Sequence, residues 1–178
     1  MLPKRNNMNE VVIRKMKDCD EDYRLLVKWY HTPQVKEYFH PQIKNLKQAK
    51  EKYQPRIIGK VPIIPYIVET DGKPIGYVQT QPIIEGFEKY NVYDYKNPFM
   101  IDLFIGESEF LRKGFGTKIL NKTIALLFEQ NVDVIVLETM RKNEKALCCY
   151  EKCKAKRIKS FYDEEYKDEI CILHITKQ

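Results

Sequence analysis

Long apolar segments are missing from this chain of 178 residues. No run approaches the ~20 apolar residues that cross a bilayer, and the N-terminal residues lack the apolar core of a secretion signal. We therefore expect a cytoplasmic protein that does not contact a membrane. Internal repeats, low-complexity tracts and linkers are also absent, and the length suits one domain. The prediction is a single domain over residues 1–178, with residues 1–10 as a loose extension.

Cysteine and histidine are few and poorly placed for metal or covalent chemistry. The 5 cysteines are an odd number, and Cys148, Cys149 and Cys153 crowd one predicted helix without the two-residue gap that zinc sites favour. The 3 histidines are scattered, and none lies beside a cysteine or serine as a covalent route requires. We expect reduced thiols, no metal ion and no acyl-enzyme intermediate.

The positive charges of the chain do not gather in one place. A net charge of +6 is compatible with nucleic-acid binding. The basic residues are nevertheless spread along the chain, and a group such as Lys44, Lys47, Lys50 and Lys52 on one predicted helix is interpreted as a solvated face. We expect no nucleic-acid partner, and the positive balance fits a highly anionic cofactor equally well.

Two common nucleotide-binding loops are missing, but another anion site is indicated. No run matches the Walker pattern, and Ile119 stands where the dinucleotide fingerprint needs its third glycine. Instead, the apolar strand 99–105 leads to Leu111-Arg112-Lys113-Gly114-Phe115-Gly116-Thr117, which opens an apolar-periodic helix. Unpaired N–H groups and the positive end of the helix dipole converge at such a start. We infer a phosphorylated ligand.

Two motifs together resemble those of the GCN5-related N-acetyltransferases. The pyrophosphate loop of that family reads Gln/Arg-x-x-Gly-x-Gly/Ala, and residues 111–116 are similar, with Leu111 in the first position. The run 143–152 resembles the family's Asn-x-x-Ala-x-x-x-Tyr-Glu-Lys helix, which lies beside the coenzyme A arm. The resemblance implies acetyl-CoA as cofactor. The cofactor-binding residues that it implies are Phe104, Ile105, Arg112, Lys113, Gly114, Phe115, Gly116, Thr117, Asn143 and Ala146.

The front half is similar to the aminoglycoside 6′-N-acetyltransferases of resistant bacteria. The matching segments are 26–29, 35–39, 65–68, 74–79 and 101–102. The resemblance implies transfer of acetyl from acetyl-CoA to the 6′-amine of a polycationic aminoglycoside, by direct attack in a ternary complex, and hence antibiotic resistance. Residues 81–98 match least, and Lys154-Ala155 replaces the usual Gly-Phe.

Asp102 is the residue expected to carry the chemistry. Aspartate is disfavoured in strands and costly to bury unpaired, and the alternation of strand 99–105 puts Asp102 on one side with Met100 and Phe104. The resemblance implies that it orients the amine and takes its proton, directly or through water. It also implies that Tyr150 serves the departing thiolate, with core packing as the alternative. The implied substrate-binding residues are Trp29, Tyr38, Gln79, Asp102 and Glu138. The alternatives are core packing for Trp29, a strand-end carboxylate exposed to water for Glu138, and a backbone cap or a lysine partner for Asp102.

The pattern of the chain predicts an α/β fold. Expected strands are 11–14, 63–70, 74–81, 99–105, 132–138, 157–162 and 169–176, and expected helices begin near residue 20 and span 46–53, 114–129 and 143–152. Asp71-Gly72 predicts a hairpin, and Pro55 and Gly59 are expected to end the helix before them. A strand, helix, strand order in the centre predicts a parallel pair. With the family resemblance, the expectation is a mixed, mostly antiparallel sheet with a splayed central parallel pair and helices on both faces.

Other functions remain open. The same fold could serve another amine, such as a hydroxylamine-bearing siderophore intermediate, a polyamine or a protein N-terminus. Residues 81–98 would discriminate, because Glu85, Glu88 and Asp94 converging with Asp102 would favour a polycation. A non-catalytic acyl-CoA sensing module would bind the cofactor without transfer. The sequence leaves open whether the protein is a monomer or a homodimer.

Overall fold

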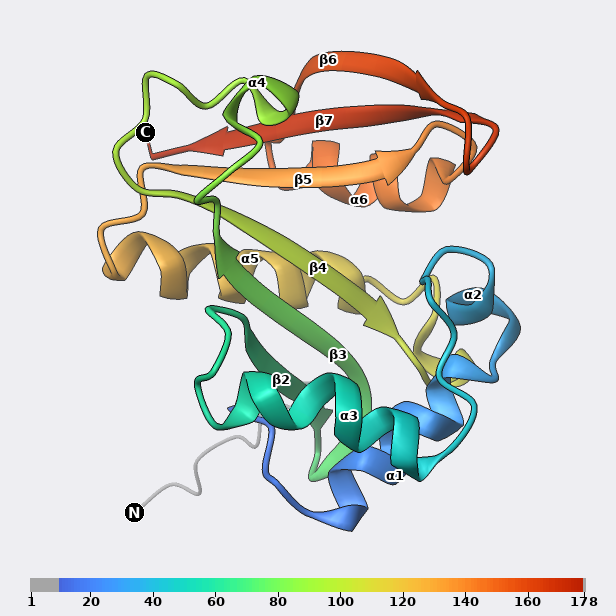
Figure 1. Ribbon diagram of the computed structural model, residues 1–178. Helices are drawn as coiled ribbons and strands as arrows, with labels where there is room; N and C mark the ends of the chain where they lie inside the picture. The colour runs from blue at the N-terminus through green and yellow to red at the C-terminus, as the bar shows by residue number, and fades with distance from the viewer. Residues whose placement is uncertain (1–9, 178) are drawn as a thin grey trace, which may run out of the picture.

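The computed structural model describes residues 10–177, which form a 7-stranded sheet in the order β1-β2-β3-β4-β5-β7-β6 (Figure 1). The predicted loose extension therefore lies, except for Glu10, outside the described residues. The strands are β1 (Val11–Lys15), β2 (Ile64–Thr70), β3 (Lys73–Pro82), β4 (Pro98–Ile105), β5 (Val134–Met140), β6 (Lys156–Asp163) and β7 (Asp168–Thr176). The helices are α1 (Asp20–Tyr30), α2 (Pro33–Lys36), α3 (Leu46–Ile57), α4 (Phe87–Tyr90), α5 (Phe115–Glu129) and α6 (Glu144–Lys152), with a 3-10 turn at Ser108–Phe110.

The sheet is antiparallel except at its centre, as the sequence predicts. Asp71 and Gly72 both have positive φ, 50° and 74°, and close the β2–β3 hairpin. The parallel pair is β4 with β5, joined by α5, and it extends only from Pro98 to Met100 on β4. Beyond Met100 the two strands separate, so that Figure 1 shows the sheet opening toward the carboxyl ends of β4 and β5. This opening is the splay that the family resemblance implies.

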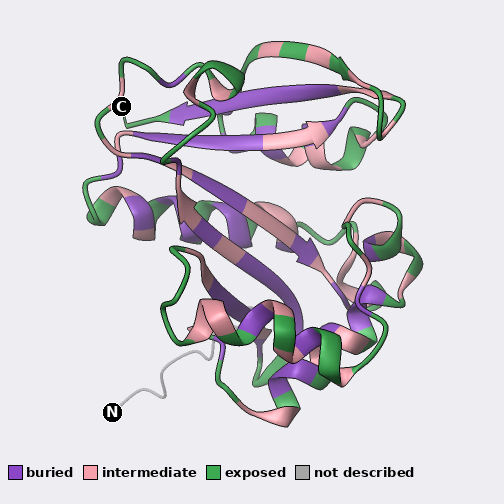
Figure 2. Ribbon diagram, in the orientation of Figure 1, coloured by how far each residue is buried: buried purple, intermediate pink, exposed green. Residues whose placement is uncertain are grey.

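Helices cover both faces of the sheet. One apolar cluster contains residues of α5 and α6 and lies on the face of the sheet that carries Ile101. A second cluster contains residues of α1 and α3 and lies on the opposite face, which carries Phe104. This agrees with the alternation expected along β4, with Phe104 and Asp102 on the side away from α5. The buried residues lie in the strands and on the inward faces of these helices, as Figure 2 shows.

The structure differs from the prediction at several element ends and in two short helices, α2 and α4, and three of these differences affect the site. α3 continues through Pro55 to Ile57, because a proline in the last turn removes only one backbone hydrogen bond. Gly59, at φ 74°, then follows the end of the helix. The connection after β3 contains the short helix α4. β5 ends two residues later than predicted, so Glu138 lies within the strand and not at its end.

Among residues 10–177 no helix combines the length and the apolar character that a bilayer span requires. The same residues contain no group of three or more His, Cys, Asp or Glu side chains arranged to hold a metal ion.

Candidate active site

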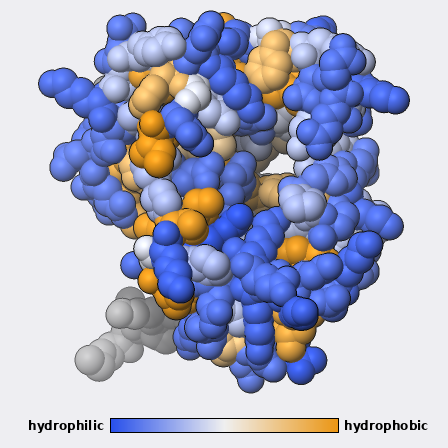
Figure 3. Space-filling view, in the orientation of Figure 1, coloured by the Kyte–Doolittle hydropathy of each residue, from blue (hydrophilic) through white to orange (hydrophobic). Residues whose placement is uncertain are grey.

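A cavity of about 400 Å³ opens where β4 and β5 separate. Figure 3 shows this face of the molecule hollowed between its two halves, with mainly hydrophilic side chains around the hollow. Side chains reach the cavity from the central strands, from α1, α3, α4 and α6, and from two connections. The lining residues that carry polar groups are Tyr30, Tyr38, His40, Lys52, Tyr53, Arg56, Tyr77, Gln79, Lys89, Tyr90, Asp102, Glu138, Thr139, Asn143, Tyr150 and Tyr166.

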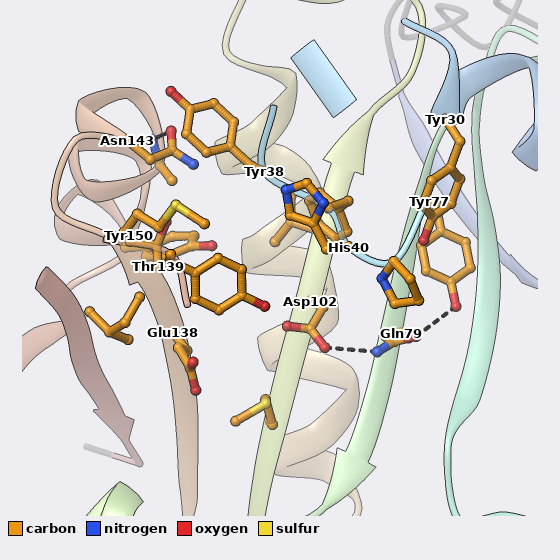
Figure 4. Close-up of a pocket in the computed structure, with 18 of the residues that line it drawn as sticks. Tyr30, Tyr38, His40, Tyr77, Gln79, Asp102, Glu138, Thr139, Asn143 and Tyr150 are labelled. Carbon is orange, nitrogen blue, oxygen red and sulfur yellow. Dashed lines mark hydrogen bonds between the residues drawn. The ribbon is translucent and has the colours of Figure 1, made fainter. Parts of the chain in front are cut away.

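Asp102 is held by a directed hydrogen-bond chain. Gln79 stands opposite it in the β3–β4 register, and its Nε2 donates to Asp102 Oδ2 at 2.7 Å (Figure 4). The amide oxygen of Gln79 accepts from the hydroxyl of Tyr77 at 2.8 Å and from Nη1 of Arg56 at 2.5 Å. Because these two donors fix the oxygen, the nitrogen of the amide must face Asp102. The carboxylate is oriented, and among residues 10–177 none donates to its other oxygen, Oδ1.

The electrostatic surroundings make Asp102 a stronger base than a free aspartate. Burial raises the pKa of Asp102, the hydrogen bond from Gln79 opposes that rise, and the charge of Glu138 adds to it. The cations Arg56 and Lys52 act in the opposite direction but do not reverse the net shift. A raised pKa brings a carboxylate closer to the range in which proton uptake from an amine is effective.

Glu138 lies on β5, across the cavity from Gln79, and already has a partner. Its Oε2 lies 3.0 Å from Nζ of Lys89, which α4 brings over the pocket. Burial lowers the pKa of Lys89, but the hydrogen bond and charge of Glu138 outweigh burial and raise it overall. Lys89 therefore stays charged at neutral pH, and an ammonium group on a substrate would have to replace it.

α6 contributes two groups to the opposite wall. Asn143 is the N-cap of α6, and its Oδ1 accepts from the N–H of Ala146 at 3.2 Å. Tyr150 is buried, and its hydroxyl has no protein hydrogen-bond partner among the described residues. Burial, followed by the charge of Asp102, raises the pKa of Tyr150. Its phenol therefore remains protonated at neutral pH and can donate to a ligand. Figure 4 shows Tyr150 and Glu138 on one side of Asp102 and Gln79 on the other.

The start of α5 fits a pyrophosphate group. Its N-cap, Gly114, has φ 81°, open space where a Cβ would stand and no side-chain cap. The first-turn N–H groups therefore have no side chain to cap them. Arg112 and Lys113 are exposed beside this turn. A Cβ on Gly116 would lie 3.3 Å from Sγ of Cys149, so this glycine allows α5 to approach α6 closely.

The remaining predicted cofactor residues lie around the same turn and along β4. Phe115 is buried and packs edge-on against Phe110, while the hydroxyl of Thr117 lies 3.7 Å from Sγ of Cys149. Ile105 is partly buried against the α5 cluster. The ring of Phe104 is buried among aromatic side chains, stacked on Tyr77 at 5.4 Å, so only its backbone is available to a ligand. Backbone groups of β4 beyond Met100 have no β5 partner, which suits an extended arm between the strands.

Trp29 is the predicted substrate-binding residue that the structure does not bring to the cavity. Its side chain has 0% exposure, and its Nε1 donates to Glu107 Oε1 at 2.9 Å. The indole packs on Gly106, where a Cβ would stand 2.1 Å from Cγ of Trp29. Trp29 therefore packs in the core, as the alternative states, because its ring fills the space where a side chain at position 106 would stand. Tyr38, Gln79, Asp102 and Glu138 all line the cavity.

The sequence interpretation missed the cations of the pocket. The sequence predicts a solvated face for Lys52 and a helix that ends before Arg56, yet both residues line the cavity from α3. Lys52 and Arg56 are four residues apart, and Tyr53 between them is buried. In a helix that continues to residue 56, this spacing places both cations on one face, beside the buried side of the helix. Glu85, Glu88 and Asp94 do not line the cavity, and Lys89 does.

Comparison with known proteins finds relatives over most of the chain. A family model described as acetyltransferase (GNAT) domain matches residues 18–162. Aminoglycoside N(6′)-acetyltransferase type 1 from Klebsiella pneumoniae is 27% identical over 152 residues, which cover 83% of this chain and 74% of that protein. The protein of the same name from Serratia marcescens matches with the same identity and coverage.

Solved structures share the fold. Aminoglycoside acetyltransferase AAC(6′)-Ib in complex with coenzyme A and kanamycin superposes with a TM-score of 0.78 at 24% identity, over 94% of this chain and 95% of that one. Spermidine N-acetyltransferase from Vibrio cholerae, in complex with CoA and spermine, has a TM-score of 0.74 at 19% identity, over 93% of this chain and 95% of that one. At these identities the likeness shows the fold alone.

Proposed function

The chain belongs to the GNAT acetyltransferase family, and we propose that it acetylates the 6′-amine of aminoglycoside antibiotics. It is an acetyl-CoA-dependent N-acetyltransferase, and the acceptor is the proposed part. One observation supports the proposal above the others: Gln79 orients Asp102 in the cavity between β4 and β5, and Tyr150 lies on the opposite wall. The curated relatives named above act, by their names, on this amine.

The residues of the chain divide the reaction between them. Acetyl-CoA supplies an activated acetyl group as a thioester. The first turn of α5, with Arg112 and Lys113, would hold the pyrophosphate, and Asn143 and Ala146 would border the pantetheine arm. Asp102 would orient the amine through Oδ1 and take its proton as the nitrogen attacks. The hydroxyl of Tyr150 would donate to the departing sulfur, because its pKa keeps it protonated.

The walls of the cavity suit an oxygen-rich amine. Seven tyrosines line it, and phenols can both donate to and accept from sugar hydroxyls. Glu138 would bind a second ammonium group of the acceptor once Lys89 is displaced. Asp102 and Glu138 are the carboxylates of the lining, whereas Lys52, Arg56 and Lys89 are its cations. With more cations than carboxylates in the lining, the second candidate is an acceptor amine that carries fewer positive charges than an aminoglycoside.

An acetyl-transfer assay tests the proposal. Purified protein, acetyl-CoA and kanamycin should release thiol, and NMR of the product should place the acetyl group on the 6′-nitrogen. An aminoglycoside with a 6′-hydroxyl in place of the amine is the matched control and should not be acetylated at that position. Expression in a susceptible bacterium should raise resistance to kanamycin, and the Asp102→Asn variant should not. Absence of turnover above background with every 6′-amino aminoglycoside would reject this acceptor.

A further inference from the structure

The inward face of α3 carries two cations that have no ion-pair partner among residues 10–177. Lys52 and Arg56 are four residues apart, partly buried, and both line the cavity. Other lysines of the same helix are paired with acids: Lys47 lies 3.9 Å from Glu51, and Lys50 lies 2.7 Å from Asp20. Among residues 10–177 no carboxylate lies within 4.0 Å of the charged group of Lys52 or Arg56, whereas the outward cations of the helix have counter-ions.

The contacts of these two cations are neutral. Nζ of Lys52 donates to the hydroxyl of Tyr30 at 3.1 Å and lies 5.1 Å from the centre of the Tyr30 ring. Nη1 of Arg56 donates to the amide oxygen of Gln79, and its Cζ lies 4.9 Å from the centre of the Tyr53 ring. A guanidinium has five N–H donors. For residues 10–177 only Nη1 of Arg56 has an acceptor, so most of its hydrogen-bonding capacity remains for a ligand.

The charge balance of the cavity points in the same direction. Lys89 and Glu138 neutralise each other, which leaves Lys52 and Arg56 against Asp102. An ammonium substrate bound at Asp102 would make this surplus larger. Partly buried cations without a counter-charge are costly, and a bound anion removes that cost through charge-assisted hydrogen bonds. Hydroxyl groups of a sugar could accept from these cations, but they would not neutralise them.

We propose that Lys52 and Arg56 form a carboxylate subsite, and that the enzyme acetylates amines that carry a carboxylate. The amine would lie at Asp102 and the carboxylate at α3. Arg56 is separated from Asp102 by the amide of Gln79 alone, so a small amino acid can reach both groups. A C–N amide bond forms as the C–S bond of the thioester breaks, and the amine proton passes to Asp102. The departing sulfur takes a proton from the hydroxyl of Tyr150, which regains one from solvent as Asp102 releases its own. The inference depends on acetyl transfer at Asp102 but not on aminoglycosides as acceptors.

Matched acceptors test the subsite. L-Lysine and L-lysinamide carry the same side-chain amine and differ in the carboxylate, as do L-ornithine and its amide. With acetyl-CoA, thiol release at pH 7 should give a kcat/KM about tenfold or more higher for each acid than for its amide, since hydrogen bonds to a charged group are worth about that much. The Lys52→Gln variant should reduce this ratio toward one. Lys47→Gln, on the outward face of the same helix, should leave it unchanged.

A binding measurement separates this inference from the proposed function. Calorimetry in the presence of CoA should show lysine binding more tightly than lysinamide, with the difference lost in Lys52→Gln. That result, together with thiol release from lysine, supports the subsite even if kanamycin is not acetylated, in which case the aminoglycoside acceptor alone is rejected. Acetylation of kanamycin with equal treatment of acids and amides overturns the subsite and leaves the proposed function standing. Tighter binding of the amides, or an unchanged ratio in Lys52→Gln, also overturns it.

Discussion

The two sides of the cavity are built in different ways. The cofactor side comes from one continuous stretch, from β4 through α5 to α6, and it offers backbone N–H groups at Gly114 and a helix cap at Asn143. The acceptor side gathers side chains from α1, α3, β3 and α4, which are far apart in the sequence, and it offers charged groups such as Arg56 and Lys89. Short motifs therefore identify the reaction, whereas the acceptor is selected by residues that only the tertiary structure brings together.

The largest effect is expected from a substitution of Asp102, because this residue lies where the cofactor side and the acceptor side of the cavity meet. Asp102→Asn keeps an oxygen that can accept from Gln79 but cannot take a proton. We expect kcat/KM for the amine to fall by ~10²–10⁴-fold, with the Kd for CoA unchanged. Asp94→Asn, an exposed acid outside the cavity, is the control and should have wild-type activity.

The pH dependence of the wild-type rate should identify the same group. Burial raises the pKa of Asp102, so the basic form is lost at a higher pH than for a free aspartate as the pH falls. The rate calculated per concentration of unprotonated amine should show an acidic limb that the Asp102→Asn variant lacks. An acidic limb that persists in the variant would assign it to another group.

Tyr150→Phe tests the cofactor side at the leaving sulfur. The ring is retained and only the donor is removed, so we expect kcat to fall by about 10²-fold with little change in KM for either substrate. Tyr162→Phe is the matched control, since this phenol is 61% exposed. Equal kcat in the Tyr150 variant and the wild type would leave Tyr150 with core packing as its role.

Gly114→Ala tests whether the start of α5 holds the cofactor through its backbone. A non-glycine residue at φ 81° costs about 1–2 kcal/mol, and the strain should lower both the unfolding free energy and the affinity for CoA, the latter by about tenfold. Gly59→Ala is a close control, because Gly59 has φ 74°, also has open space, and does not line the cavity. It should lose stability alone. Calorimetry with CoA and thermal unfolding distinguish the two outcomes, and unaltered CoA binding in Gly114→Ala would count against the site.

Lys89→Met makes the smallest expected change, on the acceptor side. It removes the partner of Glu138, and a partly exposed ion pair of this kind is worth about 0.2–1 kcal/mol. The KM for an aminoglycoside should therefore fall by roughly fivefold at most, with kcat unchanged. Lys96→Met, an exposed lysine of the same connection, should have no effect. A rise in KM on loss of Lys89 would show that Lys89 binds the acceptor instead of competing with it.

Most strands and long helices of the fold could be predicted from the sequence, because local signals indicate them. The Asp71-Gly72 turn, the alternation around Asp102 and the glycine turn before α5 each depend on a few neighbouring residues, and the structure agrees with all three. The hydrogen bond from Gln79 to Asp102 depends on the register of β3 and β4. A long connection, and not a short turn, joins these strands, so no turn type sets their register. Local reasoning does not supply that register.

Errors in the site have identifiable physical causes. Pro55 predicts a helix that ends before Arg56, so the sequence does not place Arg56 at the cavity. The last turn of a helix tolerates proline, and α3 continues to Ile57. Trp29 matched a pocket position in sequence, but the absence of a side chain at Gly106 draws the indole into the core. The pairing of Lys89 with Glu138 joins α4 to β5, two elements separated by about fifty residues, and no spacing rule predicts it.

The most direct test is a crystal structure of the protein with CoA and kanamycin bound together. The account predicts the sulfur of CoA between β4 and β5 near the hydroxyl of Tyr150, and the 6′-nitrogen about 2.6–3.2 Å from Oδ1 of Asp102. A kanamycin molecule whose amines all lie away from Asp102, or CoA bound outside the splay of the two strands, would contradict it.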